Sequence, residues 1–377
     1  MASRTRTVAV VTGLFALSAT LSPTVASASI DADPRLPSPT GARPVGTTSL
    51  YLKDTSRPDP WVPSVKAREL MVSVWYPAKA QDGRRAQYMT PKESELLLKG
   101  AGVTGVPGDV LSKTRTHAYR DAPPAGRAHR LPLVVLSPGF SWPRSSLTSL
   151  AEDLASQGYV VAGIDHTYEN HATTFPDGRV TTCVACQAPG DDVAARATKG
   201  RAIDVSFVLD QILSGRTKWK GDALIDRSRV AMAGMSLGGA SASETMLRDS
   251  RVRAGINMDG SQQVAIPRRG LKRPFMFLGQ AALDDTWSRD WPQLKGWKRW
   301  LQVQGAIHPS FADYDMLTQQ IGLDFGSKLP GDRSVVITRA YVRAFMDLHL
   351  RHRPQPLLDG PSARYPEVTF KARDSRS

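Results

Sequence analysis

The sequence predicts an α/β fold, with a mostly parallel sheet covered by helices on both faces. Between residues 131 and 350, short apolar runs alternate with longer amphipathic segments, without an internal repeat or a linker. This alternation is typical of βαβ units, whose crossover helices pack on the two faces of one sheet. The composition agrees, since 41% of the 377 residues are hydrophobic and 22% are charged, which suits one large domain with a sizeable core.

The individual elements follow in chain order. Residues 47–52 and 68–76 are expected to be early antiparallel strands, and 91–99 a short helix. The later strands are continuous apolar runs too short for helices, which is typical of strands buried on both sides. These runs are 131–136, 159–164, 230–233, 252–258, 274–278 and 300–304. The helices that accompany them are predicted at 145–157, 191–213, 239–247 and 332–350.

The two ends of the chain are expected to lie outside this domain. Residues 1–6 include two arginines, an apolar run follows, and Ala26-Ser27-Ala28 fits a cleavage site. We therefore interpret this segment as a secretory signal peptide that is cut near Ala28, after which the protein is exported. The apolar run is too short to span a bilayer. The predicted boundaries are 1–28 for the signal peptide, 29–46 for a flexible leader, 47–352 for the catalytic domain and 353–377 for a basic C-terminal tail.

The chain is basic, with a formal net charge of +14 that falls to +12 without residues 1–28, because two arginines and no acid are lost. Lysine and arginine are spread along the chain and are not interleaved with aromatic residues as in nucleic-acid-binding surfaces. Nucleic acid is therefore not an expected partner. Transient contact with anionic or lipid surfaces is the secondary interpretation, and the protein is expected to be a monomer.

The segment Gly234-Met235-Ser236-Leu237-Gly238 stands between an apolar run and a run of small residues. Strand, sharp turn and helix in this order form the context of a nucleophile elbow, in which a strained serine exposes its hydroxyl group. Glycines at both ends allow the turn to be tight. We therefore interpret Ser236 as a catalytic nucleophile. A Gly/Ser turn that links two buried elements is the alternative.

Ser236 needs a histidine and a carboxylate, since a serine hydroxyl is a weak nucleophile until an imidazole accepts its proton. His308 is the candidate base, because it follows the last predicted strand and opens a loop, whereas the other histidines precede the serine or lie on or beyond the final helix. Position alone leaves the acid open. Asp259 follows the strand after the elbow, and Asp284 and Asp285 follow the next strand. Either choice gives the order of serine, acid and histidine expected of α/β-hydrolases.

An acyl transfer also needs two N–H donors for the oxyanion of its tetrahedral intermediate. Leu237, the residue after the serine, is expected to provide one of them. The backbone of Phe140, which follows Pro138-Gly139 at the end of a predicted strand, is expected to provide the other. An ordinary turn is the alternative for Pro138-Gly139.

The only two cysteines, Cys183 and Cys186, form a Cys-x-x-Cys pair. In an exported protein such a pair most often closes as a local disulfide, which is the favoured interpretation. His166 and His171 precede it, and two imidazoles with two thiolates could instead hold a structural zinc ion. Free thiols or redox chemistry are further alternatives.

Four motifs carry a resemblance to a known family: Ser137-Pro-Gly-Phe140, Gly234-Met-Ser-Leu-Gly-Gly239, Met258-Asp-Gly260 and His308-Pro-Ser-Phe-Ala-Asp313. Together they resemble the secreted, plasma-type platelet-activating-factor acetylhydrolases and their bacterial relatives, over about residues 45–350. The resemblance implies an α/β-hydrolase fold and no metal or organic cofactor. It also implies that the acid is the one after the elbow's neighbouring strand, Asp259, and that the backbones of Phe140 and Leu237 hold the oxyanion.

Members of that family are calcium-independent lipases that cleave short or oxidised sn-2 acyl chains from phospholipids. The resemblance therefore implies a secreted serine esterase that hydrolyses short-acyl esters through an acyl-enzyme, with a small ester or a phospholipid as its substrate. A polyester or triglyceride hydrolase like the cutinases, or a peptidase of the same fold, is the alternative. A secreted binding protein without activity is the alternative from a different class.

Overall fold

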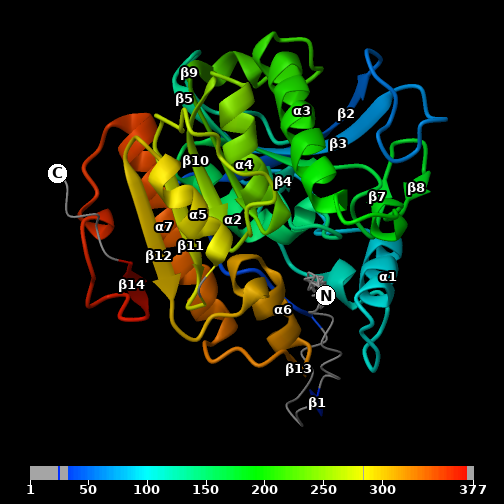
Figure 1. Ribbon diagram of the computed structural model, residues 1–377. Coiled ribbons are helices and arrows are strands. Elements are labelled where there is room, and N and C mark those ends of the chain that lie inside the picture. Colours follow the sequence, from blue (N-terminus) through cyan, green and yellow to red (C-terminus); the bar gives the residue numbers. More distant parts are fainter. Residues whose placement is uncertain (1–23, 26–32, 283, 372–377) are drawn as a thin grey trace, which may run out of the picture.

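A ten-stranded sheet runs through the centre of the computed structural model, which describes residues 24–25, 33–282 and 284–371 (Figure 1). Its strands lie in the order β14 (Val368–Phe370), β12 (Lys298–Val303), β11 (Phe275–Gln280), β10 (Val252–Met258), β9 (Ile225–Met235), β5 (Leu131–Ser137), β6 (Val160–Asp165), β3 (Arg68–Pro77), β2 (Val45–Asp54) and β4 (Tyr119–Arg120). The six strands from β12 to β6 are parallel, whereas β14 and β3 pair antiparallel with the two ends of that block. This mostly parallel sheet confirms the predicted fold class.

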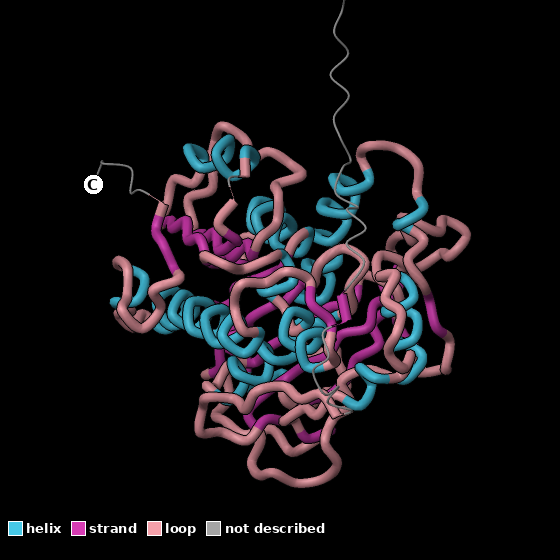
Figure 2. Tube along the Cα trace, turned by 90° about the horizontal axis from the view of Figure 1, so that it is seen from below, coloured by secondary structure: helices cyan, strands magenta, loops and turns pink. Residues whose placement is uncertain are grey.

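Helices cover both faces of the sheet (Figures 1 and 2). They include α3 (Val193–Leu213) with α4 (Leu237–Arg248) on one face and α2 (Thr148–Ser156) with α7 (Gly331–Arg351) on the other. Central strands contribute to both layers of the core. In β5, Leu133 and Val135 pack with α3 and α4, whereas Val134 and Leu136 pack with α2 and α7. Because both faces of β5 are buried, polar and apolar residues do not alternate along it, and its sequence is continuously apolar.

Shorter elements fill the connections. α1 (Pro91–Gly100) begins with a capping box, in which Thr90 Oγ1 accepts the N–H of Glu93 at 3.1 Å and Glu93 Oε2 accepts the N–H of Thr90 at 2.7 Å. The helix expected at 145–157 begins as the 3-10 helix η2 (Arg144–Leu147) and continues as α2. The remaining elements are η1 (Val110–Lys113), β7 (Thr173–Thr174), β8 (Val180–Thr181), η3 (Ala185–Gln187), η4 (Asp222–Leu224), α5 (Asp285–Asp290), η5 (Trp291–Gln293), η6 (His308–Phe311), α6 (Tyr314–Gln320) and η7 (Pro356–Leu358).

The described part of the expected leader packs against the domain before β2 begins at Val45. Leu36 is buried, and its N–H donates to the carbonyl oxygen of Arg115 at 3.0 Å. The guanidinium group of Arg339 donates to the carbonyl oxygens of Pro37 and Ser38, both at 2.9 Å. Residues 33–44 are therefore anchored to the core through their backbone.

The segment expected as a basic C-terminal tail takes part in the core. It forms η7 and then β14, which pairs with β12 at the edge of the sheet. Leu358, Tyr365 and Val368 are buried among the side chains of the α2 and α7 layer. We predicted a tail because this segment contains many basic and proline residues. These residues lie between the apolar residues that anchor the segment to the core.

The expected signal peptide lies outside the described residues, apart from Thr24–Val25. These two residues form β1, which pairs with β13 (Leu323–Asp324). No helix in the described ranges is both long and apolar enough to cross a membrane.

Candidate active site

Ser236 lies in a strained turn between β9 and α4. Its φ of +54° and ψ of −124° fall in a region that residues other than glycine rarely adopt. The turn is tight, because a Cβ atom on Gly234 would overlap the backbone of Gly238, and one on Gly238 would overlap the carbonyl group of Ser137. Only glycine fits at both positions. The serine is thereby held at the carboxyl edge of the parallel strands, where ligands bind in folds of this class.

His308 and Asp259 are joined by a hydrogen bond of 2.6 Å between Nδ1 and Oδ2. His308 begins η6 in the loop after β12, and Asp259 directly follows β10. Gln280, at the end of β11, holds the same carboxylate: its backbone N–H donates to Oδ1 at 2.8 Å and its side-chain amide to Oδ2 at 3.2 Å. A carboxylate that accepts from Nδ1–H leaves Nε2 free to take a proton.

Ser236 and the His308–Asp259 pair open into the same cavity, which has a volume of about 680 Å³. Its apolar walls come from Phe140, Val193, Ala194, Leu237, Ala282 and Trp287. Within the described ranges, no hydrogen bond joins Ser236 Oγ to His308 Nε2. Such bonds are often long in the ligand-free state of an enzyme and shorten when the substrate binds.

Asp284 and Asp285, the other candidates for the acid, have different surroundings. Asp284 is the N-cap of α5, and its side chain accepts the N–H groups of Thr286 at 2.8 Å and Trp287 at 3.2 Å. Asp285 is the first residue of that helix and is exposed. Neither is hydrogen-bonded to His308 in the part of the chain that the structure describes. Position in the sequence did not distinguish the three aspartates, but their contacts do: only Asp259 is hydrogen-bonded to His308.

The N–H groups of Phe140 and Leu237 have no acceptor among the described residues. Leu237 is the first residue of α4, where the positive end of the helix dipole also lies. Phe140 is in the turn after β5, and both residues line the cavity with Ser236. A Cβ atom on Gly139 would lie 3.5 Å from Ser236 Cβ, so this turn passes directly beside the serine. Two N–H groups without an acceptor thus belong to residues that line the cavity with Ser236, and an oxyanion hole requires donors of this kind.

Comparison with protein families gives a match to the family described as "Platelet-activating factor acetylhydrolase, isoform II", over residues 30–182 and 201–353. The chain belongs to this family. A probable 1-alkyl-2-acetylglycerophosphocholine esterase of Arthroderma benhamiae is 27% identical over 372 residues, which cover 89% of this chain and 93% of the relative. A platelet-activating factor acetylhydrolase of Canis lupus familiaris is 26% identical over 362 residues, which cover 84% of this chain and 77% of that protein.

A solved structure extends the comparison. The ferulic acid esterase of Streptomyces cinnamoneus superposes with a TM-score of 0.82 and is 41% identical, covering 90% of this chain and 99% of its own. The fold of this acetylhydrolase-family member is therefore that of the α/β-hydrolases. The family and its relatives identify it as a carboxylic ester hydrolase with the serine mechanism typical of the fold.

In this family member, the turn at Asp259 is held by side chains that the sequence did not predict to act there. Asp259 has a φ of +54°. Asn257 clamps the next residue, since its Oδ1 accepts the N–H of Gly260 at 2.8 Å and its Nδ2 donates to the Gly260 carbonyl at 2.7 Å. Trp287 Nε1 donates to the same carbonyl at 2.6 Å. Asn257 has a sequence signal, because it is the one amide in the apolar second half of its strand, whereas Gln280 has no such signal.

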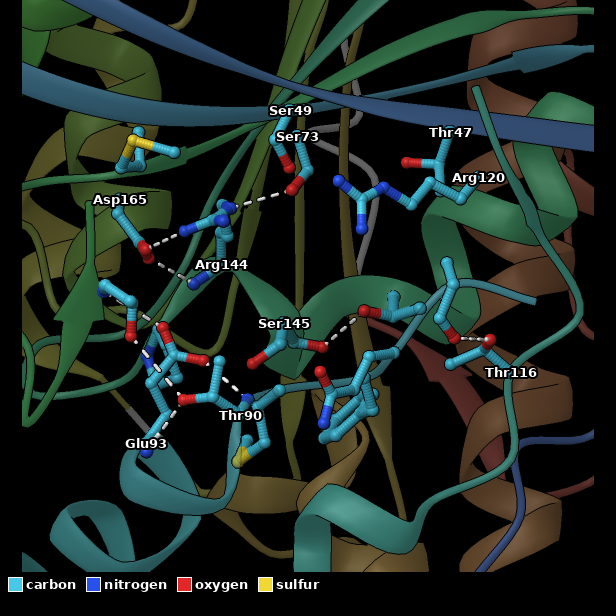
Figure 3. A pocket seen from close by; sticks show the side chains of 18 of the residues that line it. Thr47, Ser49, Ser73, Thr90, Glu93, Thr116, Arg120, Arg144, Ser145 and Asp165 are labelled. Atoms are coloured by element: carbon cyan, nitrogen blue, oxygen red, sulfur yellow. Dashed lines mark hydrogen bonds and ion pairs between the residues drawn. The ribbon is translucent and has the colours of Figure 1, made fainter. Parts of the chain in front are cut away.

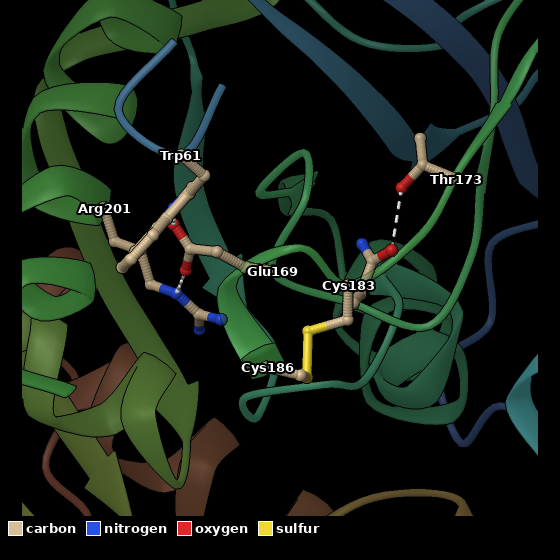
Figure 4. The surroundings of a disulfide bond; sticks show 7 residues. Trp61, Glu169, Thr173, Cys183, Cys186 and Arg201 are labelled. Atoms are coloured by element: carbon tan, nitrogen blue, oxygen red, sulfur yellow. Dashed lines mark hydrogen bonds and ion pairs between the residues drawn. A yellow bond between two sulfur atoms is a disulfide. The ribbon is translucent and has the colours of Figure 1, made fainter. Parts of the chain in front are cut away.

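Cys183 and Cys186 form a disulfide with an S–S distance of 2.06 Å, as the sequence favoured (Figure 4). The zinc alternative is wrong, because the two sulfur atoms are covalently bonded to each other. His166 is hydrogen-bonded to Ser137 and Asp204 instead. No group of three or more His, Cys, Asp or Glu side chains suited to a metal ion occurs within the described ranges. The disulfide closes a turn near Glu169 and Arg201 (Figure 4).

A second cavity, of about 460 Å³, lies beside the early strands and contains none of the candidate catalytic residues (Figure 3). Each acidic side chain on its wall has a partner, either an arginine or a backbone N–H group. Arg144 forms an ion pair with Asp165, and its Nε donates to Ser73 Oγ at 2.7 Å. On its wall, Thr90 and Glu93 complete the capping box of α1. Ser236, Asp259 and His308 all line the other cavity.

Proposed function

We propose that the protein hydrolyses short-acyl carboxylic esters through an acyl-enzyme on Ser236. His308 Nε2 takes the proton of Ser236 as Oγ attacks the carbonyl carbon, and Asp259 stabilises the imidazolium. The N–H groups of Phe140 and Leu237 hold the oxyanion. The imidazolium then protonates the leaving alkoxide. A water molecule, deprotonated by the same imidazole, then attacks the acyl carbon. The carboxylic acid leaves, and the imidazolium returns the proton to Ser236 Oγ.

One observation supports this proposal above the others: a histidine fixed by a carboxylate at 2.6 Å opens into the same cavity as a serine in an elbow. The cycle uses no metal or organic cofactor, because side chains of the protein supply each proton transfer. A peptidase or a binding protein of the same fold has less support, since the relatives named above are esterases.

The substrate class that we propose is a phospholipid or small ester with a short acyl chain, of the 1-alkyl-2-acetylglycerophosphocholine type. The names of two relatives support it. A cavity of about 680 Å³ has room for an acetyl group and part of the alcohol. We further propose that the protein contacts lipid surfaces only transiently and is a monomer. Light scattering of the purified protein, with and without phosphatidylcholine vesicles, tests both statements.

An aromatic acyl ester is the second candidate. The ferulic acid esterase is more similar in sequence, at 41% identity, than the two relatives named for phospholipid esters. Phe140 and Trp287 provide aromatic side chains on the wall of the cavity. Rings of this kind can stack on a feruloyl group.

The test of the reaction is hydrolysis of p-nitrophenyl acetate by the purified protein. We expect a burst of p-nitrophenol that equals the enzyme concentration, followed by steady turnover. Ser236→Ala should show neither, and unchanged activity in this variant would disprove the proposal. Initial rates on acetyl-phospholipid, methyl ferulate, tributyrin and a polyester film then rank the substrates. The first should be fastest, whereas a faster rate on methyl ferulate would favour the aromatic candidate.

We also propose that the protein is exported. The disulfide supports this, because such bonds persist in oxidising compartments. Residues 1–28 support it too, because they combine two arginines, an apolar run and a cleavage site at Ala26-Ser27-Ala28. The mass of the protein recovered from the culture medium should correspond to a chain that begins at Ser29. An intact N-terminus on protein retained in the cytoplasm would contradict export.

A further inference from the structure

A second chain of hydrogen bonds between a serine, a histidine and an aspartate lies behind the turn that contains Phe140. Ser137 Oγ is 3.0 Å from His166 Nε2, and His166 Nδ1 is 2.8 Å from Asp204 Oδ2. Ser137 ends β5, His166 follows β6, and Asp204 is in α3. The exposed fraction of each residue is at most 1%. This serine cannot reach a substrate, so the arrangement is not a second catalytic site.

The protonation states give each bond a direction. Although burial raises the pKa of Asp204, the charge of Arg68 and the hydrogen bond from His166 hold that pKa well below its ordinary value. Burial and the charge of Arg201 lower the pKa of His166, so its ring is neutral at working pH. Nδ1 therefore bears the hydrogen and donates to Asp204. Nε2 must then accept the hydroxyl hydrogen of Ser137.

Arg201 ties this serine to the turn itself. Its Nη1 donates to the carbonyl oxygen of Pro138 at 2.5 Å and to Ser137 Oγ at 3.4 Å. Its Nε donates to Glu169 Oε2 at 2.7 Å, an ion pair that is visible in Figure 4. The backbone carbonyl of Glu169 in turn accepts the N–H of Ser141 at 2.8 Å. The turn is thus held on both sides of Phe140.

The turn and the nucleophile elbow are in direct contact. A Cβ atom on Gly238 would overlap the carbonyl oxygen of Ser137 and lie 2.6 Å from that of Pro138. A Cβ atom on Gly139 would lie 3.1 Å from Met235 Sδ. Packing this close leaves no space for the turn to shift without changing the distance between the Phe140 N–H and Ser236.

We propose that Ser137, His166, Asp204 and Arg201 are positioning residues, which fix the Phe140 N–H where the oxyanion forms. They do not touch the substrate. Their effect is electrostatic preorganisation, since a donor stabilises a transition state fully only when it already points at the site of the developing charge. The inference rests on the proposed function, because it assigns Phe140 to the oxyanion hole of the Ser236 reaction.

The test compares two buried serines that each take part in two side-chain hydrogen bonds. Ser137→Ala removes the link to His166 and Arg201. Ser156→Ala is the control, since Ser156 in α2 donates to the Asp153 carbonyl at 2.6 Å and accepts the N–H of Gly41 at 2.9 Å, away from the cavity. Steady-state rates on p-nitrophenyl acetate are measured per active site, counted with a fluorophosphonate. An aryl trifluoromethyl ketone, which forms an oxyanion with the catalytic serine, serves as the second probe.

For Ser137→Ala we expect kcat to fall roughly tenfold, less than the loss measured when an oxyanion donor is removed outright. The KM should stay within about twofold, because the substrate's ground state does not use the oxyanion hole. The affinity for the ketone should fall by the same factor as kcat. Arg201→Lys, which keeps the charge but loses the forked donor, should change kcat and ketone affinity in the same direction. Ser156→Ala should match the wild type in all three quantities.

The outcomes separate the two proposals. If hydrolysis does not depend on Ser236, the proposed function is wrong. If it does depend on Ser236, but Ser137→Ala and Arg201→Lys keep the wild-type kcat and ketone affinity, only the positioning role is wrong. A fall in kcat without a matching loss of ketone affinity would also overturn it, because a displaced oxyanion donor must weaken both.

Discussion

Asp259 differs from its competitors in the sequence by what it touches and not by where it lies in the chain. Asp259, Asp284 and Asp285 all follow predicted strands. Only Asp259 is hydrogen-bonded to the imidazole of His308, and Gln280 donates a hydrogen bond to each oxygen of the Asp259 carboxylate. An aspartate at the end of a strand is therefore a candidate for the acid, and the contacts of its side chain decide whether it can orient the histidine.

The first prediction tests this assignment. Asp259→Asn should lower kcat by on the order of 10³- to 10⁴-fold, because an amide on Nδ1 favours the tautomer that cannot accept the serine proton. Asp285→Asn is the matched control, since it makes the same chemical change on an exposed residue. Rates on p-nitrophenyl acetate are the measurement. A comparable loss in the Asp285 variant would transfer the role to that side chain.

A second prediction concerns pH and stability. Burial raises the pKa of Asp313, in the loop that follows His308, to about 8. A carboxyl group whose pKa is raised by folding contributes stability that is complete below its unfolded pKa of about 4. That contribution is lost as the pH rises towards 8. The free energy of unfolding of the wild type should therefore fall between pH 5 and pH 8, by on the order of 4 kcal/mol from this group.

Asp313→Asn should remove most of that slope, because an amide mimics the protonated acid and cannot ionise. Urea unfolding at several pH values measures it, with Asp285→Asn as an exposed control. The wild-type slope in the Asp313 variant would show that other buried acids, such as Glu152, account for the dependence; burial raises the pKa of that group to about 7.

Sequence reasoning could locate Ser236 and His308, because a spacing motif and chain order leave few choices. It could not find the Ser137–His166–Asp204 chain. Its members are 29 and 38 positions apart, and the two local patterns that include Ser137 and His166 do not link these residues to each other or to Asp204. Buried polar networks are set by which strands and helices become neighbours. That information is in the topology and not in any one segment of the sequence.

At the scale of elements, the disulfide closes an unusually short loop. Cys183 and Cys186 are only 3 positions apart, in the connection between β8 and α3. The model that assigns disulfide stability to loop entropy gives such a short loop a small contribution. The N–H of Ala185 donates to the carbonyl of Tyr168 at 2.9 Å, so the turn also has backbone contacts of its own.

The third prediction follows. Replacing both cysteines by serine should lower the free energy of unfolding by at most about 2 kcal/mol. The kcat should stay within about threefold of the wild type, since neither cysteine lines the cavity beside Ser236. Thermal unfolding and ester hydrolysis are the measurements. Loss of activity at full stability would indicate that the disulfide, and not the backbone, holds the nearby Glu169 in place.

Most strands and long helices were predicted to within a few residues because their periodicity is strong. The exceptions are informative. α5 and α6 have only 6 and 7 residues, too few for a helical period to show. β14 has 3 residues, and only the neighbouring β12 makes it a strand. Elements that depend on a partner elsewhere in the chain have little signal of their own.

At the scale of the whole molecule, β14 covers β12, which would otherwise be the edge strand of the sheet. An unpaired edge strand exposes donors and acceptors that can pair with another chain. The fourth prediction is that Val368→Asp, at a buried position, lowers the unfolding free energy by about 3 kcal/mol or more and promotes aggregation. Thr369→Asp, on the exposed side of the same strand, should have little effect. Equal behaviour of the two variants would show that this strand does not contribute to the core.

The order of synthesis gives this strand a further importance. By the time His308 has left the ribosome, the whole candidate catalytic set has been made, but residues 368–370 have not. Until residues 368–370 have been made, the nascent polypeptide therefore offers open backbone groups along β12 to any extended neighbour. A premature stop codon shortly before position 368 would thus yield a chain that retains every candidate catalytic group and yet is prone to aggregate.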